Sequence, residues 1–137
     1  MTIALAIHGG CGTLPKAEMT DAEWAEAKAH LAKSLRAGWA VLTKGGSAVD
    51  AVEAAVLVME DSVHFNAGHG AAFNADGEHE LDASIMDGAT LAAGALCAVK
   101  RIRNPISAAK ALMHRGDPLL LTGPAGDAFA QAAARDM

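Results

Sequence analysis

The chain has 137 residues, 52% of them hydrophobic and 4% aromatic, with a formal net charge of −5 at pH 7. This length and composition fit a single domain with a hydrophobic core, in which abundant alanine favours thin layers that a second chain has to cover. The acidic balance and the lack of a Lys/Arg cluster argue against nucleic acid as a partner.

The N-terminal part predicts one strand and two helices. Residues 3–7 (IALAI) form a short apolar run closed by glycines at 9, 10 and 12, which is typical of a buried strand followed by a turn. A phosphate-binding turn is disfavoured there because neither GxxxxGK[ST] nor GxGxxG is present. Thr20 and Glu23 form a capping-box pattern that opens a helix ending near Gly45. Its predicted buried face consists of Trp24, Ala27, Leu31, Leu35, Trp39 and Leu42.

A second helix is predicted over residues 48–59, with Ser47 as its N-cap. Its only polar residues are Asp50 and Glu53, so we expect it to be sandwiched between layers.

The segment 65–88 (FNAGHGAAFNADGEHELDASIMDG) separates the helical half from the rest. Its four glycines and two Phe-Asn pairs predict a sharply folded loop whose backbone faces a ligand or another chain.

Two strands, residues 81–86 and 91–99, are expected to form a hairpin through the turn at Asp87-Gly88. Asn104-Pro105 opens a helix to about His114, residues 119–122 form a short strand, and a last helix starts at Gly123. The predicted order β, α, α, loop, β, β, α, β, α indicates an α+β fold with helices on at least one side of a sheet.

Three groups of side chains suggest chemistry. His8 and Cys11 suggest a thiolate nucleophile with a His base, although a structural role for Cys11 is favoured because no third group orients the pair. His64, His69 and His79 suggest a transition-metal site, but exposed histidines are favoured because a glycine-containing loop sets no fixed geometry and no cysteine lies nearby. The polar lining of a cleft is a further alternative.

Four carboxylates, on Glu78, Glu80, Asp82 and Asp87, suggest paired acid and base groups for glycoside chemistry. The favoured interpretation is that they cap turns or pair with Lys and Arg, because no separate base is identifiable.

The chain resembles the N-terminal half of the plant-type asparaginase and isoaspartyl peptidase family in five motifs that occur in the same order: IHGGCG (7–12), FNAGHGAAFN (65–74), HELDASIMDG (79–88), RNPISAAK (103–110) and LLLTGPAGDAFA (119–130). The resemblance implies a four-layer αββα N-terminal-nucleophile hydrolase, with this chain as its α subunit, residues 1–137 forming one portion of the domain. It also implies a β chain, released by autocatalytic cleavage, whose N-terminal Thr is the nucleophile, and an (αβ)2 heterotetramer. The implied substrates are L-asparagine and β-aspartyl dipeptides, with no catalytic cofactor.

The same resemblance implies the site residues. Gly9, Gly10 and Asn66 would line the active site beside the nucleophile. A structural sodium ion would be held by backbone carbonyls, which are hard oxygen ligands; the implied donors are Met59, Glu60, Ser62, Phe65, Ala67 and His69.

Alternatives remain open at this level. One is glycosylasparaginase or threonine-aspartase specificity, and another is a non-catalytic module that binds a small ligand or a protein through a glycine-rich pocket. The longest apolar run, residues 54–59, is too short to span a bilayer, and the N-terminus lacks a signal-peptide pattern. With two cysteines, Cys11 and Cys97, reduced thiols and a cytoplasmic location are expected.

Overall fold

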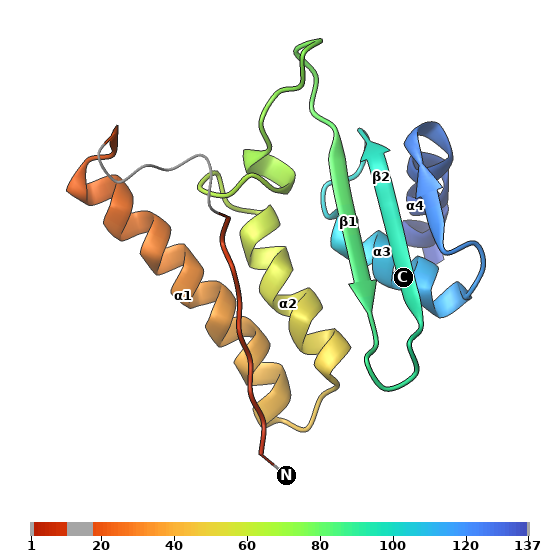
Figure 1. Cartoon of the computed structure of the whole chain (residues 1–137), viewed down its shortest axis with the longest axis horizontal. Coiled ribbons are helices and arrows are strands. Elements are labelled where there is room, and N and C mark those ends of the chain that lie inside the picture. Colours follow the sequence, from red (N-terminus) through yellow and green to blue (C-terminus); the bar gives the residue numbers. More distant parts are fainter. Residues whose placement is uncertain (1, 11–17, 137) are drawn as a thin grey trace. The chain divides into compact units, whose positions relative to one another are not determined.

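The computed structural model describes residues 2–10 and 18–136, with side chains through residue 134 (Figure 1). They form two compact units, one ending at Gly70 and the other beginning at Ala71. The first unit is helical and the second combines a sheet with helices, so the expected α+β class is confirmed. Within the residues that the structure describes, no helix is both long and apolar enough to cross a membrane.

The first unit contains α1 (Asp21–Thr43), α2 (Ala48–Glu60) and the 3-10 turn η2 (Gly68–Gly70). The predicted capping box is present: the Glu23 backbone N–H donates to Thr20 Oγ1 over 3.2 Å, and the Thr20 N–H donates to Glu23 Oε2 over 2.8 Å. These contacts satisfy backbone donors that have no partner in the first turn of a helix.

Small residues form the contact between α1 and α2. Ser34 and Gly38 of α1 and Ala51 and Ala55 of α2 are all buried. Ser34 Oγ donates a hydrogen bond of 2.7 Å to the carbonyl oxygen of Ala55. The two backbones approach closely because these side chains are short, which favours dispersion contacts along the interface.

The predicted buried face of α1 is wrong for two large residues. Leu35 and Trp39 are 39% and 42% exposed, although Ala27 of the same predicted face is buried. The two helices come closest where their side chains are smallest, so the bulky side chains of Leu35 and Trp39 lie outside that contact. Val52 of α2 is 40% exposed, so within the described residues this helix is covered on one side and not sandwiched.

Residues 2–10 form no strand, contrary to the expectation for residues 3–7. A strand requires a neighbouring strand to pair with its backbone, and the described part of the first unit contains none. The segment still alternates as a strand does: Leu5, Ile7 and Gly9 are half-buried, while Ala6 and His8 between them are exposed. Its inner side packs on the helices, since Leu5 lies beside Gly38.

The second unit contains a three-stranded sheet in the order β1 (Leu81–Met86), β2 (Ala93–Val99), β3 (Leu120–Thr122). The β1–β2 pair is antiparallel, as the predicted hairpin requires, and β2 pairs with β3 in parallel. The crossover between them is α3 (Pro105–Arg115), and α4 (Gly123–Asp136) follows β3. Both helices pack on the sheet.

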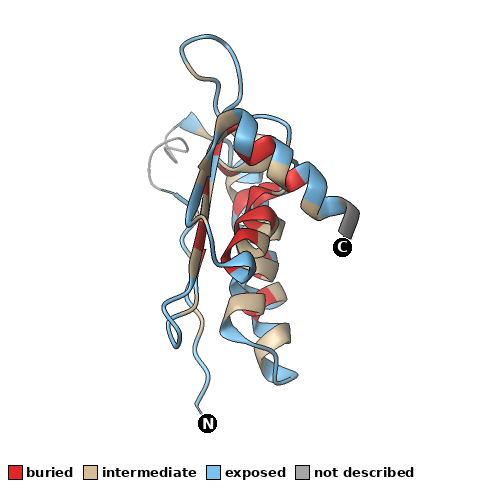
Figure 2. Cartoon of the chain, turned by 90° about the vertical axis from the view of Figure 1, so that its right-hand side faces the viewer, coloured by how far each residue is buried: buried red, intermediate tan, exposed pale blue. Residues whose placement is uncertain are grey.

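The core of this unit lies between the sheet and its two helices. Its buried cluster draws on β1, β2, α3 and α4: Leu81, Leu96, Val99, Ala108, Leu112 and Ala130. Buried and exposed positions alternate along α4, the helix that ends at the C mark in Figure 2. Along β1 the exposure changes from one residue to the next, as expected for a strand with one covered face. Leu81 and Ile85 are buried, whereas Asp82, Ser84 and Met86 are exposed. The opposite face of the strand therefore remains uncovered by residues of this unit.

The predictions for the start of β2 and for the N-cap of α3 each need a correction. β2 begins at Ala93 rather than at residue 91, because Leu91 adopts a left-handed backbone conformation (φ 62°) that does not continue a strand. Asn104 precedes α3 as expected, but its side chain makes no capping hydrogen bond; Pro105 at the first helical position suits the helix start.

Candidate functional site

The two glycine motifs of the first unit lie against each other. A Cβ added at Gly9 would lie 2.9 Å from the ring of Phe65 and 3.2 Å from Leu31, so only a glycine leaves room for this contact. Phe65 is buried and anchors its loop, while Asn66, the next residue, is exposed. The three residues that the resemblance assigns to the active site, Gly9, Gly10 and Asn66, therefore lie on two segments that touch.

The turn after residues 2–10 is also folded locally. Gly10 adopts a left-handed conformation (φ 97°), which glycine tolerates without steric cost, and its N–H donates to His8 Nδ1 over 3.2 Å. His8 thus serves as a hydrogen-bond acceptor within its own turn. Cys11, the proposed thiol partner of His8, lies outside the described residues.

The segment from Met59 to Gly70 folds back on itself. The Met59, Phe65 and Ala67 carbonyls each accept one backbone hydrogen bond within the loop, of 3.1, 2.8 and 3.1 Å. A carbonyl oxygen has two lone pairs, so each keeps one for another partner. Beside Gly70, the carbonyl oxygens of Ser62 and Phe65 converge on the position that a Cβ would occupy, with Ser62 O 2.7 Å away. These close carbonyls leave no room for a side chain at residue 70, so the fold of the loop requires glycine there.

His64, His69 and His79 do not come together in the described residues, in line with the favoured interpretation that they form no shared metal site. His69 is exposed in η2, and His79 stacks on Phe73 with ring centroids 4.2 Å apart. His64 instead joins Glu26 and His30 of α1, and one potential ligand atom from each lies within 4.8 Å of the others. Sequence reasoning missed Glu26 and His30, although their i, i+4 spacing places both on one face of a helix.

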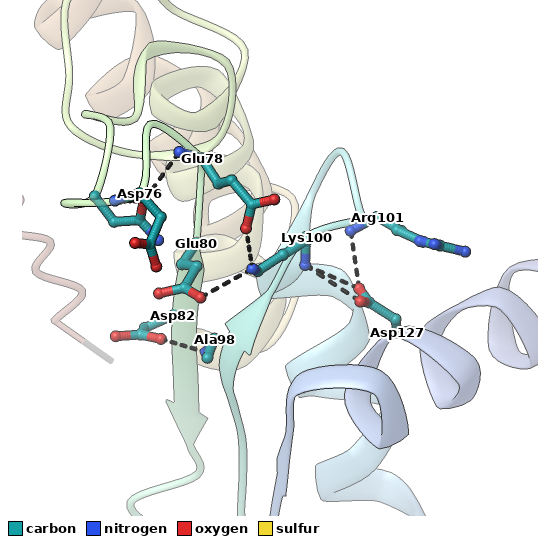
Figure 3. A network of polar contacts seen from close by, with 9 residues as sticks. Asp76, Glu78, Glu80, Asp82, Ala98, Lys100, Arg101 and Asp127 are labelled. Atoms are coloured by element: carbon teal, nitrogen blue, oxygen red, sulfur yellow. Dashed lines mark hydrogen bonds and ion pairs between the residues drawn. The ribbon is translucent and has the colours of Figure 1, made fainter.

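Two of the four carboxylates, those of Glu78 and Glu80, belong to an ion-pair cluster around Lys100 (Figure 3). Lys100 Nζ contacts Glu78 Oε2 and lies 3.2 Å from Glu80 Oε1. Hydrogen bonds with Asn74 and then Lys100 lower the pKa of Glu80, and those with Glu78 and then Glu80 raise the pKa of Lys100. The Glu80 carboxylate is thus held in the charged form, which suits ion pairing and not proton donation.

Asp82 supports a bulge in the hairpin. The register shifts between residues 81 and 83 so that Ala98 is an extra residue in β2, with a left-handed φ of 53°. The Ala98 N–H donates to Asp82 Oδ1 over 2.7 Å. The same carboxylate raises the pKa of the Cys97 thiol by hydrogen bonding and by its charge. A raised thiol pKa leaves less thiolate at neutral pH, so Cys97 is a poor nucleophile.

The remaining acidic groups also have structural roles. Asp87 caps the hairpin turn: its pKa is lowered by the Ala89 N–H and then by Thr90, whose hydroxyl donates over 2.8 Å. The preferred interpretation of the carboxylates as turn caps and ion-pair partners is therefore confirmed.

Asp127 of α4 is buried and joins that helix to the end of β2. Its Oδ1 accepts the backbone N–H groups of Lys100 and Arg101 over 3.0 and 2.9 Å (Figure 3). A hollow of about 520 Å³ opens beside these residues and the first turn of α4. Its lysine is already neutralised by two glutamates, so the hollow offers little net charge to a ligand.

Comparison with known proteins identifies one family. Residues 1–136 match the family model described as asparaginase. The chain is 43% identical over 132 residues to an isoaspartyl peptidase/L-asparaginase of Danio rerio, covering 96% of this chain and 41% of that protein. It is 41% identical over 133 residues to an isoaspartyl peptidase of Salmonella typhimurium, covering 96% of this chain and 42% of that protein. A plant-type L-asparaginase of Pyrococcus abyssi is 42% identical over 129 residues, covering 94% of this chain and 41% of that protein. The chain thus spans about two fifths of the length of these relatives.

Proposed function

Because this chain belongs to the asparaginase family, we propose that it is the N-terminal, α portion of an N-terminal-nucleophile hydrolase. The proposed substrates are the side-chain amide of L-asparagine and β-aspartyl peptide bonds, in line with the names of its relatives. Since the chain corresponds to about two fifths of those proteins, the catalytic Thr is proposed to begin the β chain that follows autocatalytic cleavage.

The proposed reaction is acyl transfer through a Thr hydroxyl. The hydroxyl oxygen attacks the side-chain carbonyl carbon, and the α-amine of the same Thr accepts the hydroxyl proton and passes it to the leaving nitrogen. The C–N bond breaks and releases ammonia or the amine of a peptide, leaving an ester on the Thr. Water then hydrolyses the ester and releases the aspartyl product.

The contact between Gly9 and Phe65 carries this proposal. It joins the glycine motif at residues 8–10 to the loop of Asn66, the two elements that the family places beside the nucleophile. In the proposed site, Gly9 and Gly10 let backbone approach the Thr closely, and the Asn66 amide, which is both a donor and an acceptor, orients the Thr by hydrogen bonding.

A structural sodium ion in the loop is part of the proposal. The proposed donors are the backbone carbonyls of Met59, Glu60, Ser62, Phe65, Ala67 and His69. The lone pair that the Met59, Phe65 and Ala67 oxygens each keep beside their one loop hydrogen bond supports this choice. When bound, the ion supplies charge that holds these carbonyls together. The chain's own contribution to catalysis is then a fixed position for Phe65 and Asn66.

The β chain is proposed to complete a four-layer αββα domain, with two such units forming (αβ)2. The exposed outer side of residues 2–10 offers unpaired backbone to a neighbouring strand. Exposed apolar residues of the hairpin, Met86 and Leu91 at 55% and 69%, provide surface that a second layer would cover.

The test is to express the complete protein, including the sequence that follows these residues, and to assay release of ammonia from L-asparagine and of leucine from β-aspartyl-leucine. N-terminal sequencing should find a second polypeptide beginning with Thr, and replacing that Thr by Ala should abolish turnover. A single uncleaved polypeptide without either activity would refute the hydrolase and favour a binding module. Hydrolysis of N-glycosylated asparagine alone would move the substrate assignment to glycosylasparaginase.

A further inference from the structure

Three side chains of the first unit converge outside the proposed sodium site. Glu26 and His30 lie one turn apart on α1, and His64 lies in the loop after α2. One potential ligand atom from each lies within 4.8 Å of the other two. We propose that Glu26, His30 and His64 form a binding site for one divalent transition-metal ion, with Zn²⁺ as the best match.

The donor set favours Zn²⁺. Imidazole nitrogen and carboxylate oxygen are established zinc ligands, and two histidines with one glutamate leave a fourth position for water. With zinc–ligand bonds of about 2.0–2.2 Å, a tetrahedral site separates its ligand atoms by roughly 3.3–3.6 Å. Glu26 Oε1 and His64 Nε2 are 3.7 Å apart, so that pair needs almost no movement.

His30 supplies an independent observation. Its Nδ1 is buried and has no hydrogen-bond partner among the residues described, which leaves a polar atom desolvated without compensation. A metal ion bound at Nδ1 would satisfy that atom. The His30 ring lies edge-on to the His64 ring, with centroids 5.0 Å apart. A Glu26–His64 ion pair alone would leave the His30 nitrogen unsatisfied.

Local charge favours a cation. The Glu26 side chain is 62% exposed, and its Oε1 already lies beside His64. Glu23, one turn earlier on α1, adds a second carboxylate to the same end of the helix. The negative charges of Glu23 and Glu26 therefore favour binding of a cation at this end of α1.

The local backbone fixes the position of His64. The His64 N–H donates to the hydroxyl of buried Ser62 over 3.2 Å, and Phe65 on its other side is buried. The proposed sodium ion uses backbone carbonyls of this loop, whereas the Zn²⁺ site uses the His64 side chain, so the two sites differ in both ligands and chemistry. Bound Zn²⁺ would cross-link α1 to the loop.

The binding experiment uses untagged complete protein, stripped with a chelator and titrated with ZnCl₂ by calorimetry. We expect one ion bound through this site per chain, and the visible absorption of tetrahedral Co²⁺ when cobalt replaces zinc. Glu26→Gln, His30→Gln and His64→Asn should each weaken that binding by at least about 10-fold, the loss that even outer-shell partners can cause. Because the Glu26 side chain is mostly exposed, Glu26→Gln reads out the site without risk to the core.

His69→Gln and His79→Gln are the matched controls, since both histidines are exposed and lie outside the cluster. They should keep wild-type affinity, and Zn²⁺ should raise the unfolding temperature of these controls but not of Glu26→Gln. Zinc affinity that is unchanged in both Glu26→Gln and His64→Asn, or no zinc binding by the wild-type protein, would overturn the site. Neither outcome bears on asparaginase activity, so this test and that of the proposed function can fail separately.

Discussion

Two asparagines that each follow a phenylalanine, Asn66 and Asn74, should separate activity from stability. Asn74 has a structural role: its Oδ1 accepts the backbone N–H groups of Asp76 and Glu78 over 3.0 and 2.9 Å. Each such hydrogen bond contributes about 0.5–1.5 kcal/mol net. Asn74→Ala should therefore lower the free energy of unfolding by about 1–3 kcal/mol while leaving turnover nearly unchanged below the unfolding transition.

Asn66→Ala should have the opposite effect. Asn66 is exposed and its neighbour Phe65 anchors the loop, so we expect a stability loss of about 0.5 kcal/mol or less. In the proposed site its amide orients the Thr nucleophile, and a displacement of about 1 Å can lower the rate on the order of 100-fold. The turnover number should fall by about that factor, with a smaller change in KM, because substrate contacts are retained.

The assay pairs initial rates on L-asparagine with urea unfolding of the same complete-protein preparations. Autocleavage is followed by intact mass, so that a slow precursor is not mistaken for a slow enzyme. If the two variants lose activity equally, or if the Asn66→Ala loss follows its unfolding curve, the case for an active-site Asn66 fails.

Three further predictions concern the second unit. A Cβ at Gly94 would collide with the α3 backbone, so Gly94→Ala should cost about 1–3 kcal/mol in urea unfolding; an unchanged midpoint would contradict this packing. Since Asp82 raises the pKa of Cys97, Asp82→Asn should lower it and speed iodoacetamide alkylation of Cys97 at pH 8, measured by peptide mass spectrometry; an unchanged rate would count against the contact. The hydrogen bonds that lower the pKa of Glu80 stabilise the fold above the usual Glu range, and this gain is lost as the pH falls through the folded pKa. The hydrogen bonds that raise the pKa of Lys100 stabilise the fold below the usual Lys range, and this stabilisation is lost as the pH rises through the folded pKa of Lys100. Urea unfolding of wild type and Lys100→Met should therefore differ most near neutral pH and converge at both extremes, whereas a constant difference would refute the ion-pair cluster.

Elements with local signals could be predicted from the residues alone. The Thr20–Glu23 capping box, the Asp87 turn and the proline at the start of α3 each act over at most a few residues, and the structure contains all three. Local hydrogen bonds and fixed backbone angles do not depend on what packs around them, so their pattern can be read directly. The motif order likewise indicated the asparaginase family that the comparison found.

Which side chains contact each other depends on how the elements pack, and this could not be read from the sequence. The buried face of α1 follows its closest approach to α2, so buried Ser34 and Gly38 lie in the contact while Leu35 and Trp39 are exposed. Residues 3–7 carry a strand pattern but form no strand, because pairing depends on a neighbour that the described part of their unit does not provide. The meeting of His64 with α1 depends on how a loop folds after a helix, across more than thirty residues of chain. Periodicity fixes where a residue lies on its own element, whereas contacts between elements depend on helix crossing and loop path, which packing of the whole unit determines.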